Sequence, residues 1–379
     1  MTDAGTSRPR LSSALDGCTV VIAVDRRAGE LTAALERHGA AVRQAPALTI
    51  VPHIDDAALL DATRDLIETP PDVVVATTGV GFRGWIEAAH EADLADELAQ
   101  AFAGAQIVAR GPKARGAIQQ AGFQADWVAE SETAQELGEF LLAEGVAGKR
   151  IAVQHHGSGA DGLDEMFRAH GADVVSITVY RWGPPADPDI VRQSVLATAA
   201  GETDAVLFTS APGTSEWLAE AERAGALDDI RRLAERGRVV MAAVGPITVQ
   251  PLDDRDIPAI VAERGRLGSL VRGVVTHFGG GSAPGLDTVR GRLEMRSAGA
   301  VLDGVFRPLS RTSTAVLSDL FDAGGAVIAR RELQVALPRS NRSTHAVEMA
   351  IARLRESLGF PDLIKTVVKR GYRLNVEDI

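Results

Sequence analysis

Basic side chains near the end of the chain form a pattern that could bind nucleic acid. Val347, Ile351, Leu354 and Leu358 recur at helical spacing, which predicts a helix with one apolar face and with Arg353 on the other. A helix of this kind can enter a DNA major groove, where arginine binds base edges or phosphates. The polar face of the predicted helix also contains His345, Met349, Ala352 and Glu356.

Two short alternating segments follow this helix, at residues 364–368 and 372–376. They predict two strands around Lys369-Arg370-Gly371, a tight basic turn that can reach a neighbouring minor groove. Two shorter helical patterns precede the helix. This order predicts a small α+β winged-helix domain at residues 290–379.

Charge divides the chain in the same way. Fifteen Lys and Arg and ten Asp and Glu occur from Arg290 onward, a net charge of about +5. The whole chain has a net charge of −11, so the part before Arg290 has about −16. An acidic body repels DNA, which leaves the C-terminal part as the DNA-facing one.

The C-terminal part resembles the effector domain of OmpR-type response regulators. In that family the recognition helix ends in a pattern like I-x-R-L-R-x-x-L, and the wing contains T-V and G-Y-R. Here residues 351–358 are I-A-R-L-R-E-S-L, residues 366–367 are T-V and residues 371–374 are G-Y-R-L. Residues 293–309 resemble that domain's small N-terminal sheet. The chain departs from the family at Ala350 and Ala352, where polar or basic residues are common, and at Lys369, where Gly is frequent.

The partner that this resemblance implies is double-stranded DNA. Single winged helices bind DNA weakly, so we expect a homodimer on repeated half-sites. The residues that we expect to contact DNA are Arg342, Thr344, His345, Met349, Arg353, Arg355, Lys369, Arg370 and Arg373.

The preceding part alternates short apolar runs with helical patterns. Apolar strands separated by helices indicate doubly wound parallel sheets, so the fold class of this part is α/β. The predicted strands are residues 20–24, 41–44, 73–77, 107–109, 151–154, 174–179, 206–209 and 239–244.

This α/β body also repeats itself, which indicates two similar lobes. D-V-V-V-A-T-T at residues 72–78 matches D-A-V-L-F-T-S at residues 204–210, and Trp85 matches Trp217, 132 residues later. Gly111-Pro112 recurs as Gly245-Pro246. We expect a body at residues 11–278 in which one lobe is inserted into the other. Lobe 1 would comprise residues 11–47 and 182–278, and lobe 2 residues 48–181.

Short blocks in both lobes resemble uroporphyrinogen-III synthase, a two-lobed enzyme that binds hydroxymethylbilane between its lobes and closes it with inversion of one ring. The blocks are T-T at 77–78, G-P-K at 111–113, V-Y-R at 179–181, F-T-S at 208–210 and G-P-I-T at 245–248. The resemblance implies a ligand cleft at which backbone N–H groups and hydroxyls bind a polycarboxylate. The residues expected there are Arg26, Thr77, Thr78, Lys113, His156, Tyr180, Ser210 and Thr248.

Two departures leave the synthase activity open. Ala114 stands where family members usually have Thr, although Thr248 of the other lobe and Tyr180 are present. Residues 154–157 are Q-H-H-G where the family tends to have a basic residue. We therefore favour a ligand-sensing body, and the alternative is a working synthase with an appended DNA-binding domain. For Tyr180 and Thr248, packing at a hinge is the alternative to ligand contact.

Other patterns predict no cofactor and no metal. G-V-G-F-R-G at residues 79–84 follows a strand, but no acidic residue ends the next strand, where Arg110 lies, so we do not expect nicotinamide binding. We expect His155 and His156 to contact solvent or ligand, because no carboxylate pair is nearby in the sequence. Cys18 is the sole cysteine and is expected in the core. No signal peptide or membrane span is indicated, so we expect a cytoplasmic protein.

Residues 279–289, which begin G-G-G-S-A-P-G, predict a flexible linker between body and DNA-binding domain. Ligand binding could then alter the presentation of the DNA-binding domains without rigid coupling. The architecture is similar to that of actinobacterial regulators associated with nitrate and nitrite assimilation, which implies control of nitrogen-assimilation genes. A scaffold that binds a partner regulator is a third hypothesis.

Overall fold

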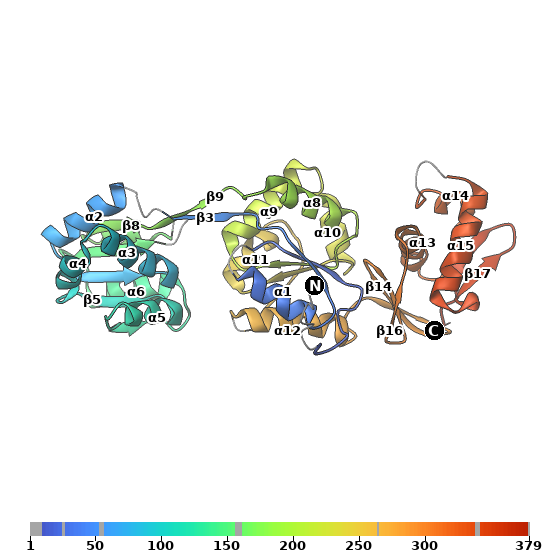
Figure 1. Cartoon of the computed structure of the whole chain (residues 1–379), viewed down its shortest axis with the longest axis horizontal. Helices are drawn as coiled ribbons and strands as arrows, with labels where there is room; N and C mark the ends of the chain where they lie inside the picture. The colour runs from blue at the N-terminus through green and yellow to red at the C-terminus, as the bar shows by residue number, and fades with distance from the viewer. Residues whose placement is uncertain are drawn as a thin grey trace, which may run out of the picture. The chain divides into compact units, whose positions relative to one another are not determined.

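The computed structural model describes residues 10–24, 27–52, 57–155, 161–263, 265–337 and 342–377. The chain divides into two compact units (Figure 1). One consists of Met1–Leu48 and Pro185–Ile379, and the other of Thr49–Pro184. The second unit differs by a few residues from the expected lobe 2.

The unit Thr49–Pro184 contains a five-stranded parallel sheet in the order β6-β5-β4-β7-β8. Its apolar strand residues alternate between two cores, as expected for a sheet that is covered on both faces. Val74 and Ala76 pack against α2 to α5, and Val73 and Val75 pack against α6 and α7. The strands are β4 (Val73–Ala76), β5 (Gln106–Ala109), β6 (Trp127–Val128), β7 (Arg150–His155) and β8 (Asp173–Thr178). The helices are α2 (Ala57–Glu68), α3 (Gly79–Glu91), α4 (Ala95–Phe102), α5 (Pro112–Gln120), α6 (Ala134–Glu144) and α7 (Leu163–Ala169).

The other unit contains another parallel sheet, in the order β12-β11-β10-β1-β2, and we call it the first sheet because it contains β1. Val206 and Phe208 pack against α8 to α11, whereas Ala205 and Leu207 face α1 and α12. The strands are β1 (Thr19–Ile22), β2 (Ala41–Gln44), β10 (Ala205–Phe208), β11 (Val240–Ala243) and β12 (Ala259–Val261). The helices are α1 (Ala28–Glu36), α8 (Pro188–Ala199), α9 (Ala211–Arg223), α10 (Leu227–Glu235), α11 (Pro246–Asp253) and α12 (Leu267–Gly279).

Equivalent residues of the two sheets make equivalent contacts, which confirms the repeat. Trp85 is fully buried and donates from its indole N–H to the hydroxyl of Thr63 at 3.0 Å. Trp217 does the same with Ser194, also at 3.0 Å. All eight predicted strands of the body are present, and Cys18 is buried as expected. The sequence patterns missed β6, β12 and an antiparallel pair, β3 (Thr49–Pro52) with β9 (Tyr180–Gly183).

The C-terminal domain begins with a four-stranded antiparallel sheet, β13 (Gly285–Thr288), β14 (Gly291–Arg296), β15 (Gly299–Leu302) and β16 (Val305–Pro308). Three helices follow, α13 (Arg311–Asp322), α14 (Arg330–Leu333) and α15 (Thr344–Leu358). The last two strands, β17 (Ile364–Val367) and β18 (Gly371–Leu374), form an antiparallel hairpin. Leu293, Leu317, Leu354 and Tyr372 belong to one common core, so sheet, helices and hairpin form a winged helix.

The expected linker contains regular structure. Gly279 ends α12, and residues 285–288 form β13, which pairs with β14. Ala283 is 2% exposed and packs in the core of the first sheet. The glycine-rich composition suggested a free tether, but tertiary contacts order most of this segment. No helix in the described part of the chain is long and apolar enough to cross a membrane.

Candidate functional site

Helix α15 presents one face to solvent, as its sequence pattern predicts. Its buried side is formed by the predicted apolar residues together with Ala346 and Ala350. Ser343 caps the first turn by accepting a hydrogen bond from the N–H of Ala346 at 3.1 Å, and Gly359 ends the helix with φ of 78°. The exposed face contains Thr344, His345, Met349, Ala352, Arg353 and Glu356.

The second arginine of the I-x-R-L-R pattern has a different environment from the first. Arg353 is exposed and free to reach a ligand. The guanidinium of Arg355 instead donates to the carbonyl oxygen of Ile364 and to the hydroxyl of Thr366. It also lies 6.0 Å from the centre of the Tyr372 ring. Arg355 therefore holds the hairpin against α15, although we expected it to contact DNA.

The first two residues of the G-Y-R motif, Gly371 and Tyr372, are required by their contacts with Ile328. A Cβ on Gly371 would lie 1.9 Å from the carbonyl oxygen of Ile328, so no larger residue fits. Tyr372 is buried and pairs with Ile328 through two backbone hydrogen bonds. Lys369, at the hairpin tip, has φ of 62°, in the left-handed region that favours glycine. The glycine that the family often has at this place would suit the backbone better.

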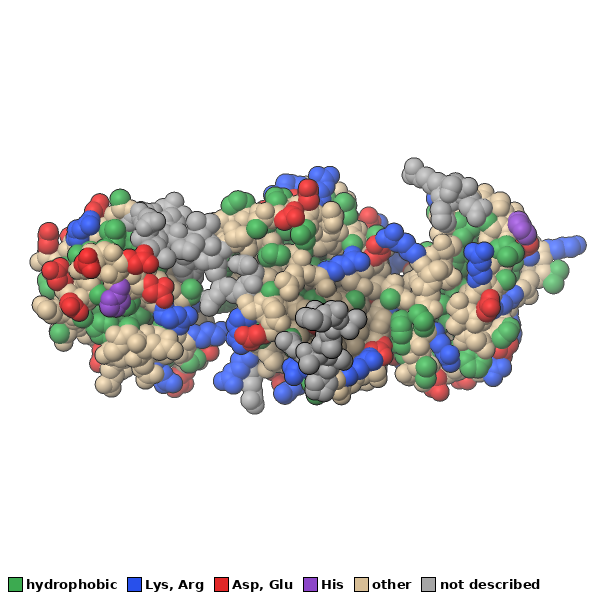
Figure 2. All heavy atoms as spheres, in the orientation of Figure 1, with side chains coloured by type: hydrophobic (Ala, Val, Ile, Leu, Met, Phe, Trp, Pro, Cys, Tyr) green, Lys and Arg blue, Asp and Glu red, His purple; other side chains and the backbone are tan. Residues whose placement is uncertain are grey.

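The remaining expected DNA contacts differ in exposure. Lys369 and Arg370 are exposed at the hairpin tip, and Arg373 is half-buried on β18. Arg342 is exposed but donates to the carbonyl oxygens of Val335 and Leu337, both at 3.3 Å. Figure 2 shows Lys and Arg side chains on the surface of this domain.

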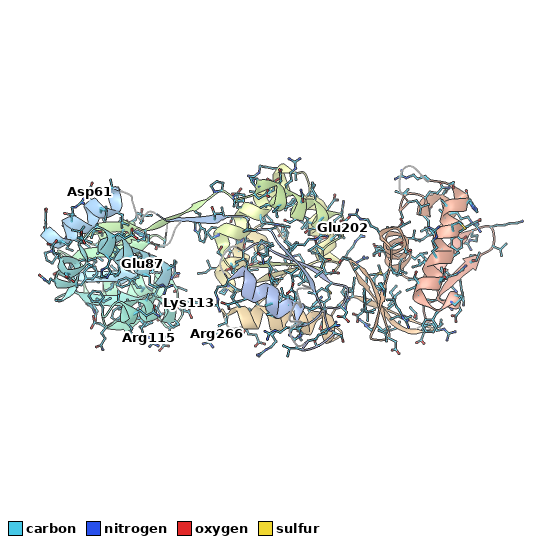
Figure 3. The ribbon with its side chains drawn as sticks, viewed as in Figure 1. Asp61, Glu87, Lys113, Arg115, Glu202 and Arg266 are labelled. Carbon is cyan, nitrogen blue, oxygen red and sulfur yellow. The ribbon has the colours of Figure 1, made fainter. Side chains whose placement is uncertain are left out.

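In the unit Thr49–Pro184, three expected ligand residues follow the ends of two adjacent strands. Thr77 is buried and donates to the carbonyl oxygen of Gln154 at 2.7 Å, so its hydroxyl already has a partner. Thr78 caps α3 by accepting from the N–H of Gly81 at 3.1 Å. Lys113 is exposed at the start of α5 (Figure 3). A Cβ on Gly79 would lie 2.3 Å from the carbonyl oxygen of Lys113, which brings the first turns of α3 and α5 together.

The other sheet has an equivalent pair of helix starts. Ser210 caps α9 by accepting from the N–H of Gly213 at 3.3 Å, as Thr78 caps α3. Thr248 is buried in α11, and its carbonyl oxygen accepts from the hydroxyl of Thr214 at 3.1 Å. This burial favours the packing hypothesis for Thr248. Arg26, His156 and the side chain of Tyr180 lie outside the described residues.

Helices α5 and α11 both begin with Gly-Pro and have no side-chain cap. Their first backbone N–H groups therefore have no intramolecular side-chain acceptor, and such groups can bind carboxylates. Ala114 in α5 occupies the place of Thr248 in α11, and it is buried. This region of each unit could bind an anion through backbone groups.

The G-x-G-x-x-G pattern has a packing explanation. A Cβ on Gly81 would lie 2.0 Å from the side-chain nitrogen of Gln154, and Gly79 touches the backbone of α5. Close packing of α3 against β7 and α5 thus accounts for both glycines.

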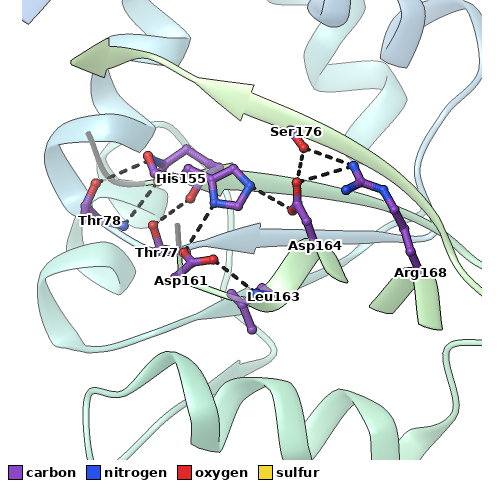
Figure 4. A network of polar contacts seen from close by, with 9 residues as sticks. Thr77, Thr78, His155, Asp161, Leu163, Asp164, Arg168 and Ser176 are labelled. Carbon is purple, nitrogen blue, oxygen red and sulfur yellow. Dashed lines mark hydrogen bonds and ion pairs between the residues drawn. The ribbon is translucent and has the colours of Figure 1, made fainter. Parts of the chain in front are cut away.

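His155 lies in a buried network that the sequence did not indicate (Figure 4). Its Nδ1 lies 3.3 Å from Asp161 and its Nε2 lies 2.8 Å from Asp164. Asp164 also accepts from Ser176 and from Arg168. We expected no carboxylate pair near this histidine, and that expectation was wrong because both acids follow it by several residues and fold back onto it.

The network sets the charge of His155. Burial lowers the pKa of the imidazole, but the two hydrogen-bonded carboxylates outweigh it and raise the pKa to about 9. The same contacts lower the pKa of Asp164 despite its burial. No group of acidic, histidine or cysteine side chains in the described part of the chain could hold a metal ion.

Fold and sites together define a class of protein: an α/β body of two repeated, doubly wound sheets, joined to a winged-helix domain of the OmpR type. Residues 29–272 match the family model "Uroporphyrinogen-III synthase HemD", and residues 307–374 match "Transcriptional regulatory protein, C terminal". The chain belongs to the uroporphyrinogen-III synthase family, with an OmpR-type DNA-binding domain at its C-terminal end. This fusion supports a DNA-binding regulator.

Individual relatives match the body. An uncharacterized protein of Bacillus subtilis, YjjA, is 28% identical over 269 residues, which cover 71% of this chain and 98% of the relative. A putative uroporphyrinogen-III synthase of Methanothermobacter thermautotrophicus is 28% identical over 190 residues, 48% of this chain and 73% of the relative. A mutant uroporphyrinogen-III synthase of Thermus thermophilus, solved as a crystal structure, is 29% identical with a TM-score of 0.56. That match covers 68% of this chain and 97% of the crystallised one.

Proposed function

We propose that the protein is a sequence-specific transcriptional regulator whose synthase-like body binds a small anionic or tetrapyrrole ligand and thereby alters DNA affinity. The observation that supports it most is the exposed face of α15, with Arg353 and Met349, in a domain fused to a ligand-binding fold. The expected partner is duplex DNA with repeated half-sites, bound by a homodimer.

Binding to DNA is tested by selecting genomic fragments with the full-length protein and measuring Kd at several salt concentrations. Arg353→Ala and Lys369→Ala should each weaken binding and make its salt dependence shallower. Arg192→Ala, an exposed residue of α8 in the acidic body, is the matched control. Unchanged affinity and salt slope in both DNA-face variants would exclude this interface.

The ligand part of the proposal rests on the uncapped helix starts at Gly111 and Gly245. Helix N-termini attract carboxylates, and the family binds a polycarboxylate tetrapyrrole precursor. Calorimetric titration with hydroxymethylbilane analogues, nitrate and nitrite tests it. A ligand that binds the protein and shifts its DNA affinity supports sensing. If each probe leaves the DNA affinity unchanged, the sensing proposal fails for these ligand classes.

We propose nitrogen-assimilation genes as the targets, and this assignment rests only on the order of the two domains. Similar regulators are associated with nitrate and nitrite assimilation, so selected fragments should include promoters of those genes. Fragments from unrelated promoters only would reject the nitrogen assignment and leave DNA binding intact.

A second function is a working synthase with an appended DNA-binding domain. Its support is the family membership of the body, whereas the burial of Thr248 in α11 and the presence of Ala114 at the start of α5 argue against it. The decisive assay separates uroporphyrinogen III from the spontaneously formed I isomer with the full-length protein. Turnover at ordinary enzymatic rates favours a bifunctional enzyme, whereas product identical to the uncatalysed control favours sensing.

A further inference from the structure

A buried carboxylate joins the first sheet to the DNA-binding domain. Asp204, which directly precedes β10, is 4% exposed. Its Oδ1 accepts from the backbone N–H of Ser297, at 2.9 Å, and Ser297 lies in the turn between β14 and β15 of the C-terminal domain. Its Oδ2 accepts from the N–H of Thr19 at 2.7 Å and from the hydroxyl of Ser297. We call this set of contacts the Asp204–Ser297 junction.

The internal repeat shows what is special about Asp204. Its counterpart in the other unit is Asp72, which precedes β4 and accepts from the N–H of Arg150 at 2.7 Å. This bond ties two neighbouring strands, as the bond from Thr19 does for Asp204. Asp72, however, is exposed. The additional contacts of Asp204 come from the DNA-binding domain, so a strand-pairing residue of the repeat has gained a second role.

A second buried contact lies beside the junction. Arg296 is 3% exposed and donates to the carbonyl oxygen of Phe278, the penultimate residue of α12, at 3.2 Å. It pairs with Glu294 at 2.8 Å and lies 4.8 Å from the centre of the Phe278 ring. Glu294 also pairs with Arg292 at 3.3 Å, so removal of the Arg296 guanidinium would leave this buried carboxylate with one of its two cationic partners, which is costly.

Ion pairs surround these buried groups. Arg238, before β11, pairs with Asp322 at 3.0 Å and lies over the ring of Phe321 in α13. Glu202, labelled in Figure 3, pairs with Arg311 at the start of α13. Ion pairs near the surface contribute little each to stability, but they fix orientation.

Strand β10 links this contact to the candidate ligand site. Asp204 lies before its first residue, and Ser210, which caps α9, follows its last. Four residues of extended chain span about 13 Å. A change at the start of α9 therefore acts on the same strand that holds the DNA-binding domain.

We propose that the Asp204–Ser297 junction docks the DNA-binding domain rigidly on the first sheet, so that a signal from the body reaches DNA through β10 and not through a free tether. The ligand signal rests on the proposed function, but the docking does not. This replaces the uncoupled presentation that the glycine-rich segment had suggested.

The test measures the spread of distances between two spin labels in the full-length protein. Labels are placed on Arg192→Cys and Ser357→Cys, exposed positions of α8 and α15, in a Cys18→Ala background. The wild-type junction should give one narrow distance distribution. Asp204→Asn replaces one carboxylate oxygen with an amide NH₂ group, which would face the donor N–H groups of Ser297 or Thr19. This variant should widen the distribution of label distances about twofold or more. Asp72→Asn should leave it narrow, although it perturbs the equivalent strand bond.

A second variant covers the case in which Asp204→Asn fails to fold. Ser297→Ala combined with Asp322→Lys removes a hydroxyl donor in a turn and places a cation against Arg238 in place of its ion-pair partner, and it should widen the distribution as well. A broad distribution in the wild-type protein would overturn rigid docking. A narrow distance distribution in both variants would show that the Asp204–Ser297 junction does not hold the DNA-binding domain in place. The measurement uses neither ligand nor DNA, so it is independent of whether the ligand response exists.

Discussion

The guanidinium of Arg355 donates a hydrogen bond of 2.9 Å to the hydroxyl of Thr366 and so connects the recognition helix with the wing. Arg353, two residues earlier, is exposed. Two arginines of one sequence motif thus have different environments, because Arg355 is bound to the wing and Arg353 is exposed on the α15 face that we propose for DNA.

This difference predicts opposite effects of two substitutions. Arg353→Ala should lower DNA affinity by about 1–3 kcal/mol, the value of one good arginine–base contact, and leave the Tm unchanged. Arg355→Ala should lower the free energy of unfolding by about 1–2 kcal/mol, because it removes hydrogen bonds that hold the wing. Thermal unfolding and gel-shift titration of both variants check this. A stable Arg355→Ala variant with lost affinity would mean that Arg355 contacts DNA directly.

Lys369 should lower the stability of the folded protein through its backbone conformation and raise the affinity for DNA through its charge. Because its backbone is in the left-handed region, Lys369→Gly should stabilise the protein by about 1 kcal/mol. The same change removes a cation at the hairpin tip, so the slope of log K against log salt should fall by about 1. Lys365→Gly, on the strand of the same hairpin, is a control in which stability should fall.

Met349 predicts a preference for thymine. Its side chain is 43% exposed at the middle of the α15 face, where an apolar group can contact the thymine methyl in a major groove. Deoxyuridine in place of thymidine at the contacted positions should weaken binding about fourfold per lost methyl, from about 0.8 kcal/mol per buried carbon. Met349→Ala should bind both DNAs equally. If the wild-type protein binds thymidine and deoxyuridine DNA equally, Met349 does not contact a thymine methyl, but the proposal that the domain binds DNA would still stand.

His155 predicts a pH-dependent stability. The folded-state pKa of about 9 lies above the ordinary value of 6.5, so the stabilisation is fully present below pH 6.5 and is lost as pH rises through about 9. The groups that face this imidazole are Asp161 and Asp164, and Arg168 contacts the latter.

Unfolding measured between pH 6 and pH 9.5 tests this contribution. The difference between wild type and His155→Gln should shrink across that range by on the order of 3 kcal/mol. His170→Gln, which replaces an exposed histidine of the same unit, should show no such trend. A difference that does not vary with pH would mean that His155 acts by packing alone.

The sequence alone determined the features that local pattern and composition encode. Short, near-continuous apolar runs specified the strands β4, β7 and β10, which are buried on both faces, and helical spacing specified the two faces of α15. The motifs at residues 351–358 and 371–374 were sufficient to recognise the winged helix, although the need for glycine at position 371 comes from a distant contact, the carbonyl oxygen of Ile328.

Tertiary structure decided the partners of polar groups that are distant along the chain. His155 is cationic because Asp161 and Asp164 return to it, and Arg355 is occupied because the wing folds against α15. Asp204 and Asp72 occupy equivalent places in the repeat, yet only the fold places Ser297 over one of them. The glycine-rich segment suggested a free tether because composition reports the freedom of an isolated chain, whereas contacts with the rest of the molecule determine whether that freedom remains.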